Sequence, residues 1–118
     1  MKYLCLIYDN EQEWQKFPAD VQQKYMGEYG AFTDSIKKSG QFVGANQLQP
    51  THTATTVRAR NGKLSTTDGP YAETKEQLGG YYLIEAKDLN DAIQVASRIP
   101  SARSGSIEVR PVVEARGM

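Results

Sequence analysis

Two segments of this chain, residues 2–8 and 80–86, carry apolar side chains on both alternating sets of positions. An extended segment without a polar face must be covered on both sides in the folded protein. We therefore expect these segments to be the central strands of one sheet. The requirement is restrictive, because a chain of 118 residues forms one domain with a core of limited size.

Helical periodicity follows the first of these strands, between residues 18 and 39. Pro18 suits the first helical position, and Gly40 suits the left-handed residue after the last turn. Gly27 and Gly30 lie inside this helix, and close approach of another backbone is one explanation for them. The apolar stripe, with spacings of three and four, consists of Val21, Tyr25, Tyr29, Phe32 and Ile36.

A second helix is expected after the strand at residues 80–86. Asp88 is a suitable N-cap, and Pro100 is expected to stop the helix. The residues 9–16 are instead expected to form a polar connection that Trp14 anchors. The expected apolar stripe of the second helix consists of Leu89, Ala92, Ile93, Ala96 and Ile99.

The other strands are expected at residues 41–47 and 106–113, and Pro111 favours a sheet edge for the last one. Asn61-Gly62 is a strong two-residue hairpin signal between strands at 54–60 and 63–67. This hairpin is expected to have one solvated face, because one set of alternating residues, Thr55, Val57 and Ala59, is less polar than the other, Thr56, Arg58 and Arg60.

The order of these elements predicts an α+β, ferredoxin-like βαββαβ fold with an inserted β-hairpin. In that topology the first and third core strands are central, and the second and fourth lie at the edges. Two helices cover only one face of the sheet, so the other face would expose tyrosine and leucine side chains. We expect a two-fold homodimer that stacks sheet on sheet.

Composition narrows the class of protein further. Fourteen basic and fourteen acidic residues cancel, which argues against nucleic-acid binding. The longest uncharged run, 41–57, is too polar to span a membrane. The apolar N-terminus lacks a small-residue cleavage site, so no signal peptide is expected. Cys5, the single cysteine, is expected to be an inert core thiol, and we expect a cytoplasmic protein.

The segment 68–82 concentrates three carboxylates, a lysine, three glycines and a proline between two predicted strands. Loops on rigid scaffolds are where proteins tend to place their chemistry. Asp68 is the candidate catalytic residue, because partial burial raises the pKa of a carboxylate toward neutral pH. The alternative is a turn aspartate that accepts a hydrogen bond from the backbone two residues on.

The rest of this loop supplies candidate ligand-binding groups. Tyr71, Glu73 and Lys75 alternate, so an extended loop would project them the same way, toward a polar metabolite or an oxyanion. Alternatively, Glu73 and Lys75 form a solvated pair worth about 0–1 kcal/mol. Gly69 and Pro70 complete the set. Gly79-Gly80 has no Walker spacing, and is expected to allow close packing or ligand approach.

The expected ligand-binding set also includes two residues outside the loop. His52, the single histidine, titrates near neutrality, and Arg58 can orient a carboxylate or a phosphate. The alternatives are a plain surface histidine and a solvated strand face. No spaced histidine, cysteine or carboxylate cluster accompanies His52, so no metal site is expected. No cofactor is expected either.

Three stretches, 1–8, 68–85 and 106–112, resemble the YCII-related family, and more narrowly its branch named for an Asp-Gly-Pro-Phe motif. Tyr71 stands in place of the phenylalanine. The resemblance covers nearly the whole chain and implies a dimeric α+β barrel of ferredoxin-like subunits. It also implies a histidine on the first helix paired with an aspartate near the end of the second. Neither is present here, where the second helix is followed by Ser101.

These observations leave two hypotheses open. In the first, the chain is a small-molecule-binding dimer whose site is built around the loop 68–71. In the second, it is a cofactor-free enzyme in which Asp68 transfers a proton during isomerisation, dehydration or lactone-type chemistry. The substitution Asp68→Asn separates them, because an enzyme would lose turnover and keep its fold and ligand affinity.

Overall fold

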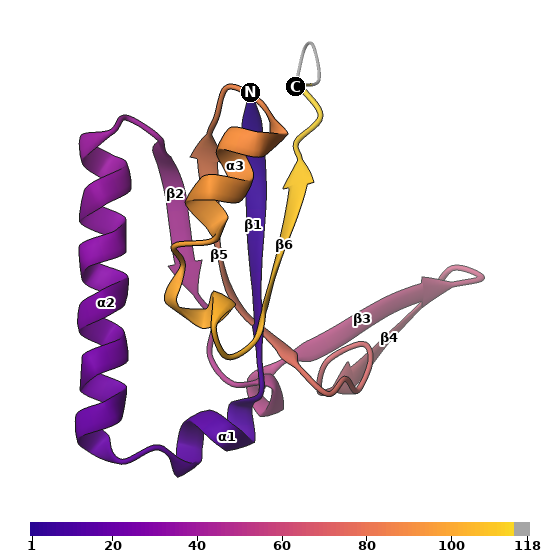
Figure 1. Ribbon diagram of the computed structural model, residues 1–118. Coiled ribbons are helices and arrows are strands. Elements are labelled where there is room, and N and C mark those ends of the chain that lie inside the picture. Colours follow the sequence, from indigo (N-terminus) through magenta and orange to yellow (C-terminus); the bar gives the residue numbers. More distant parts are fainter. Residues whose placement is uncertain (115–118) are drawn as a thin grey trace.

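The computed structural model describes residues 1–114 of the chain (Figure 1). A four-stranded antiparallel sheet has the order β2-β5-β1-β6. Its strands are β1 (Lys2–Asp9), β2 (Phe42–Gln47), β5 (Gln77–Glu85) and β6 (Ser106–Pro111). The two strands without a polar face, β1 and β5, are central, and Pro111 lies in an edge strand, as expected. The strand order is that of a ferredoxin-like fold.

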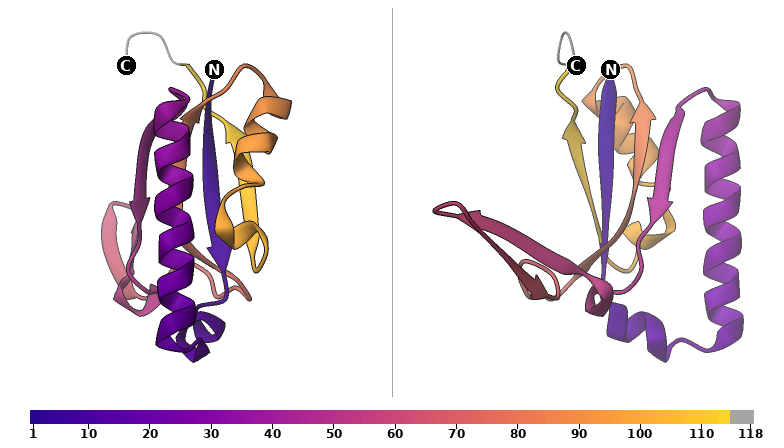
Figure 2. Two further views of the ribbon diagram at one scale, coloured as in Figure 1. Left: turned by 60° about the vertical axis from the view of Figure 1, so that its left-hand side comes forward. Right: turned by 180° about the vertical axis from the view of Figure 1, so that it is seen from behind.

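Two helices, α2 (Ala19–Lys38) and α3 (Leu89–Ala96), cover one face of this sheet (Figures 1 and 2). Tyr3, Cys5 and Ile7 of β1 point toward the helices and are buried. On the other face, Leu4, Leu6 and Tyr8 are only half-buried. The core between sheet and helices includes Tyr3, Cys5, Ile7, Phe32, Ile36, Tyr82, Ile84, Ala92, Val95 and Ile99.

A short helix, α1 (Glu11–Lys16), replaces the polar connection expected at residues 9–16. Asn10 begins it, because its side-chain oxygen accepts hydrogen bonds from the backbone N–H groups of Gln12 and Glu13. A helix of six residues is too short to show an apolar stripe, which is why periodicity missed it. Trp14 does anchor the segment, with its ring centroid 5.8 Å from that of Tyr25.

Two details of the expected helices are wrong. On α3, Leu89 and Ile93 are exposed, and Val95 takes their place in the core, because the helix presents a different edge of its apolar arc to the sheet. On α2, a Cβ added to Gly27 or Gly30 would meet no atom within 4 Å. Close backbone approach therefore does not explain these two glycines. Gly40, with a φ of 78°, does end α2 in the left-handed conformation.

The hairpin of β3 (Thr55–Arg60) and β4 (Lys63–Asp68) forms a separate two-stranded sheet. Its turn residues Asn61 and Gly62 have φ values of 54° and 74°, as the sequence predicts. The hairpin projects away from the body of the molecule (Figure 2). The radius of gyration is accordingly 16.3 Å, whereas a compact domain of this length has a value of about 13–14 Å.

None of the described helices is both long enough and apolar enough to cross a membrane.

Candidate functional site

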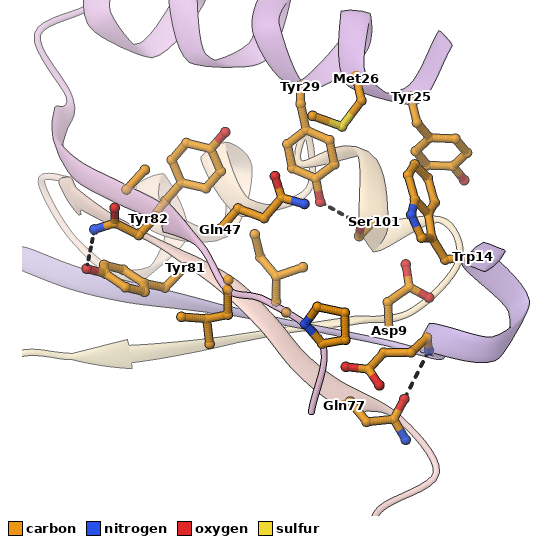
Figure 3. Close-up of a pocket in the computed structure, with 18 of the residues that line it drawn as sticks. Asp9, Trp14, Tyr25, Met26, Tyr29, Gln47, Gln77, Tyr81, Tyr82 and Ser101 are labelled. Carbon is orange, nitrogen blue, oxygen red and sulfur yellow. Dashed lines mark hydrogen bonds between the residues drawn. The ribbon is translucent and has the colours of Figure 1, made fainter. Parts of the chain in front are cut away.

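A cavity of about 390 Å³ lies between α1, α2 and the sheet (Figure 3). Its volume falls within the usual range of small-molecule sites. Trp14 and Tyr25 lie at one end of the view, and Tyr81 and Tyr82 lie at the other. The walls come from α1, α2, β1, β2, β5 and the segment after α3, so segments distant in the sequence enclose the space.

Aromatic rings form one end of the cavity. The rings of Trp14 and Tyr25 meet edge to face, with an interplanar angle of 90°. Phe17 stacks on Tyr25 and also meets Trp14 edge to face, each at a centroid distance of 5.9 Å. Because each ring is held by another, this wall is preorganised for a flat ligand.

Tyr29 and Ser101 are joined by a hydrogen bond of 2.5 Å between their hydroxyl oxygens (Figure 3). Ser101 is the one buried polar side chain among the described residues, with 6% of its surface exposed. Burial raises the pKa of Tyr29, and its hydrogen bonds with Ser101 offset part of the rise. Tyr29 is therefore a neutral phenol at physiological pH, and it presents a hydrogen-bonding hydroxyl to the cavity.

A second phenol is oriented by a chain of hydrogen bonds. The Thr33 hydroxyl donates to the backbone carbonyl of Tyr29 at 2.9 Å. Thr33 has only one hydroxyl proton, so in its 2.7 Å contact with Tyr82 it is the Tyr82 hydroxyl that donates. The Tyr82 oxygen keeps its acceptor lone pairs. Burial also raises the pKa of Tyr82, so it too stays protonated.

Two carboxylates line the end of the cavity near α1, and both are held by neutral donors. Asp9 accepts hydrogen bonds from the Asn10 backbone at 2.9 Å and the Ser104 hydroxyl at 2.8 Å. Glu11 accepts hydrogen bonds from the backbone and the hydroxyl of Thr51, both at 2.8 Å. These bonds fix the positions of the carboxylates. Because the donors are uncharged, they do not neutralise the negative charges.

The floor of the cavity depends on the close approach of β2 and β5 at Gly80. A Cβ atom added there would lie 2.8 Å from the carbonyl oxygen of Asn46, a separation that real Cβ atoms do not show. The close packing expected for Gly79-Gly80 is therefore confirmed at Gly80. It is wrong for Gly79, where an added Cβ would meet nothing within 4 Å.

The residues that the sequence suggested as a site lie elsewhere, on the hairpin and the loop after it. Asp68 ends β4 and is exposed, and Tyr71 has 82% of its surface exposed. Gly69 has a φ of 104° and connects the loop to the start of β3 through two hydrogen bonds. Its N–H donates to the Ala54 carbonyl, and its carbonyl accepts from the Thr56 hydroxyl. The other members, Pro70, Glu73, Lys75, Arg58 and His52, are exposed.

None of these eight residues lines the cavity. Within residues 1–114, the Asp68 carboxylate accepts no hydrogen bond, so the turn interaction weighed for it is absent. Glu73 and Lys75 form no ion pair within the same range. The structure therefore brings these groups into one exposed region and does not enclose them.

Sequence reasoning missed the cavity residues for identifiable reasons. Tyr25 and Tyr29 belong to the apolar stripe of α2, and Tyr82 belongs to a core strand, so all three were expected to be core or interface. The signal available was chemical, since tyrosine carries a hydroxyl that needs a partner when it is buried. Ser101 occupies the region where the family resemblance implies an aspartate, and Tyr29 lies on the helix where it implies a histidine.

The fold and the partly enclosed cavity define a ferredoxin-like α+β domain with a cavity of small-molecule size. The chain belongs to the YCII-related domain family, whose model matches residues 1–116. The narrower Asp-Gly-Pro-Phe branch stays a prediction. An uncharacterised protein of Rhizobium meliloti (strain 1021) is 34% identical over 114 residues, which cover 95% of this chain and 92% of the relative.

A solved structure shares the fold at low sequence identity. It is 5-chloro-2-hydroxyhydroquinone dehydrochlorinase from Burkholderia phenoliruptrix AC1100, in complex with 2,5-dihydroxybenzoquinone. The TM-score is 0.57 and the identity 13%, with 98% of this chain and 97% of that chain covered. This likeness supports the α+β barrel class of fold.

Residues 1–114 contain no group of three or more histidine, cysteine or carboxylate side chains placed to hold a metal ion. The cavity instead offers aromatic surface and neutral hydroxyl groups beside two carboxylates.

Proposed function

We propose that this protein binds a small, planar, hydroxyl- or amine-bearing organic molecule in the cavity between α1, α2 and the sheet. The observation that carries the proposal is the hydroxyl pair of half-buried Tyr29 and buried Ser101, which lies in a cavity with aromatic rings at one end. Buried polar groups that face a cavity orient ligands, because a ligand that leaves them unpaired loses affinity. The aromatic side chains of Trp14 and Tyr25 in the lining favour a ligand that carries a ring.

The ligand bound in the dehydrochlorinase complex supports a ligand of the size of one ring. That protein shares the fold and holds a six-membered ring with hydroxyl and carbonyl substituents. The support is limited to size and class, since the two chains differ at most positions. The direct support comes from this chain's own tyrosines and serine.

Binding can be followed through Trp14, the single tryptophan of the chain, which lines the cavity. Hydroquinone serves as a neutral planar probe, with fluorescence of Trp14 and isothermal titration calorimetry as readouts. Tyr29→Phe removes one hydroxyl from the cavity and is expected to weaken binding about five- to tenfold, the value of one hydrogen bond. The matched control is Tyr71→Phe, which removes an exposed phenol outside the cavity.

Equal losses in both variants, or no binding of hydroquinone and related phenols to the parent protein, would contradict the proposal. A thermal melt of each variant shows whether the fold is retained. The predicted pattern is a loss confined to Tyr29→Phe.

A cofactor-free enzyme is the second candidate. One observation favours it: the exposed Asp68 carboxylate is free of hydrogen bonds within the described residues, so it is available to a substrate. In this alternative Asp68 transfers a proton, and Tyr71, Lys75 or Arg58 stabilises the developing negative charge. Turnover that disappears in Asp68→Asn, with the fold intact, would support it.

We further propose that the protein acts as a cytoplasmic homodimer. The sheet face opposite the helices carries Leu4, Leu6, Tyr8 and Leu83, all half-buried, and nothing in the described chain covers it. Two copies stacked on this face would remove the apolar surface from water. Light scattering should give twice the chain mass of 13.1 kDa. Leu6→Glu should give the single mass, and Gln23→Glu, on exposed α2 surface, should not.

A further inference from the structure

We propose that the cavity selects an organic cation, a protonated amine carried on a small ring, over an anion of the same shape. This inference rests on the proposed function, because it names the ligand class of the same site. It is drawn from the charges that face the cavity, from the groups that hold those charges, and from the rings beside them.

The charge balance of the cavity lining is negative. Among the described residues, Asp9 and Glu11 are the lining side chains that carry charge, and no lysine, arginine or histidine lines the space. The whole chain has a net charge of zero, so this imbalance is local. A bound anion would meet two carboxylates without a compensating cation, which is unfavourable in a partly enclosed site.

The two carboxylates have not already been neutralised by other parts of the chain. All four hydrogen bonds described for them come from backbone N–H or hydroxyl groups. Neither Asp9 nor Glu11 belongs to an ion pair within residues 1–114. Each carboxylate oxygen accepts one of these bonds and retains a lone pair, so an ammonium group can be accepted without displacing an existing donor.

The groups that would attract an anion are occupied. Arg103 lies close to the cavity wall, with its guanidinium 5.3 Å from the centre of the Tyr25 ring. It forms an ion pair with Glu28, and the two line a separate hollow on the other side of α2. At the start of α1, the Asn10 side chain and the Gln77 side chain accept the free backbone N–H groups.

The aromatic end of the cavity favours the same class of ligand. The faces of tryptophan and tyrosine rings are electron-rich and attract cations, and Trp14 is the strongest of these partners. Burial is the main cause of the raised pKa of Tyr29, and the nearby Asp9 carboxylate is among the smaller contributions in the same direction. An ammonium group between the rings and the carboxylates would therefore satisfy both.

Three matched probes test the proposal: tyramine as the cation, 4-hydroxyphenylethanol as the neutral form and 4-hydroxyphenylacetate as the anion. Titrations at one pH and ionic strength use Trp14 fluorescence and calorimetry on the full chain. Tyramine is expected to bind at least about tenfold more tightly than the anion. Asp9→Asn is expected to remove most of this advantage and leave the neutral probe unchanged. Glu11→Gln, a second variant, should act in the same direction.

Glu13→Gln is the control, because Glu13 is an exposed carboxylate on α1 that pairs with Lys16 and does not line the cavity. Equal or tighter binding of the anion overturns the cation preference and leaves the proposed function intact, provided that the neutral probe binds. If no probe binds, the proposed function itself fails, and the preference fails with it. A loss of neutral-probe binding in Asp9→Asn would assign Asp9 a role in folding. In that case Glu11→Gln decides whether a lining carboxylate causes the preference for the cation.

Discussion

The cavity and the hairpin arm differ in how they treat functional side chains. Around the cavity, tyrosine and serine hydroxyls are paired and at least half-buried, as at Tyr29 and Ser101. In the hairpin arm, which we define as β3, β4 and the loop to residue 76, every residue of β4 is exposed. The arm is the richer of the two in charged and turn-forming residues. The cavity is the region in which we propose that a ligand binds.

This difference indicates that, for binding a ligand, partial enclosure of the polar groups matters more than the number of polar and charged residues in a segment. An exposed charge is surrounded by water and screened by salt, so its interactions are weak. A hydroxyl in a partly dry cavity has few competitors for its hydrogen bond, so a ligand gains more by pairing with it. The following predictions compare the two regions by substitution.

The largest expected difference is in stability. Ile36 on α2 is fully buried in the core between the helices and the sheet, whereas Leu64 on β4 has 73% of its surface exposed. Ile36→Ala should lower the free energy of unfolding by about 2–5 kcal/mol, because it leaves a void in the core. Leu64→Ala should change it by less than about 0.5 kcal/mol. Urea titration measures both, and a cost at Leu64 similar to that at Ile36 would show that the arm is buried against a partner.

The next effect concerns the cavity floor. Gly80→Ala forces a Cβ against the carbonyl of Asn46 and should cost about 1–3 kcal/mol. Gly79→Ala is the matched control, because the added Cβ has open space. Thermal or urea unfolding distinguishes the two. Equal effects at the two glycines would mean that β2 and β5 do not approach closely at this point.

A pH effect of intermediate size is expected from Cys5, in the core beside the cavity. Burial raises the pKa of its thiol from 9.0 to about 11. Folding therefore favours the neutral thiol, and this stabilisation is complete below pH 9 and is lost as the pH rises toward 11. The free energy of unfolding should fall by up to about 1.4 kcal/mol per pH unit in this window.

Urea titrations at several alkaline pH values measure this slope. Cys5→Ala should flatten it between pH 9 and 10, below the range in which the buried tyrosines Tyr29 and Tyr82 titrate. Tyr71→Phe, in the exposed arm, should leave the profile unchanged. A parent protein whose stability is flat from pH 9 to 11 would contradict the burial of this thiol.

The smallest effect is expected at Asp68, the residue of the hairpin arm that would transfer a proton if the protein were an enzyme. Asp68→Asn should change stability by less than about 0.5 kcal/mol, because the carboxylate is exposed and accepts no hydrogen bond in the described chain. Affinity for a cavity ligand should also be unchanged. A clear loss of binding or turnover would place the arm in the site, and the contrast between the two regions would break down.

Periodicity predicted most of the fold, and its errors have physical causes. The strands and the two long helices were expected from alternation and from the stripe of α2. The turn at Asn61-Gly62 followed from the φ > 0 that its type demands. The exposed positions Leu89 and Ile93 on α3 were expected in the core, since an apolar arc wider than the contact surface does not show which edge is buried.

The sequence by itself determined the sheet, because residues 2–8 and 80–86 have no polar face and so must be central. It also determined the family, through motifs spread along the chain. Only the tertiary structure decided where the cavity lies. Trp14, Tyr29 and Ser101 are separated by up to 87 positions, 101 minus 14 in the chain numbering. A pattern of polarity shows which side of an element faces inward. Whether the inward side chains fill the space or leave a cavity depends on how distant segments meet.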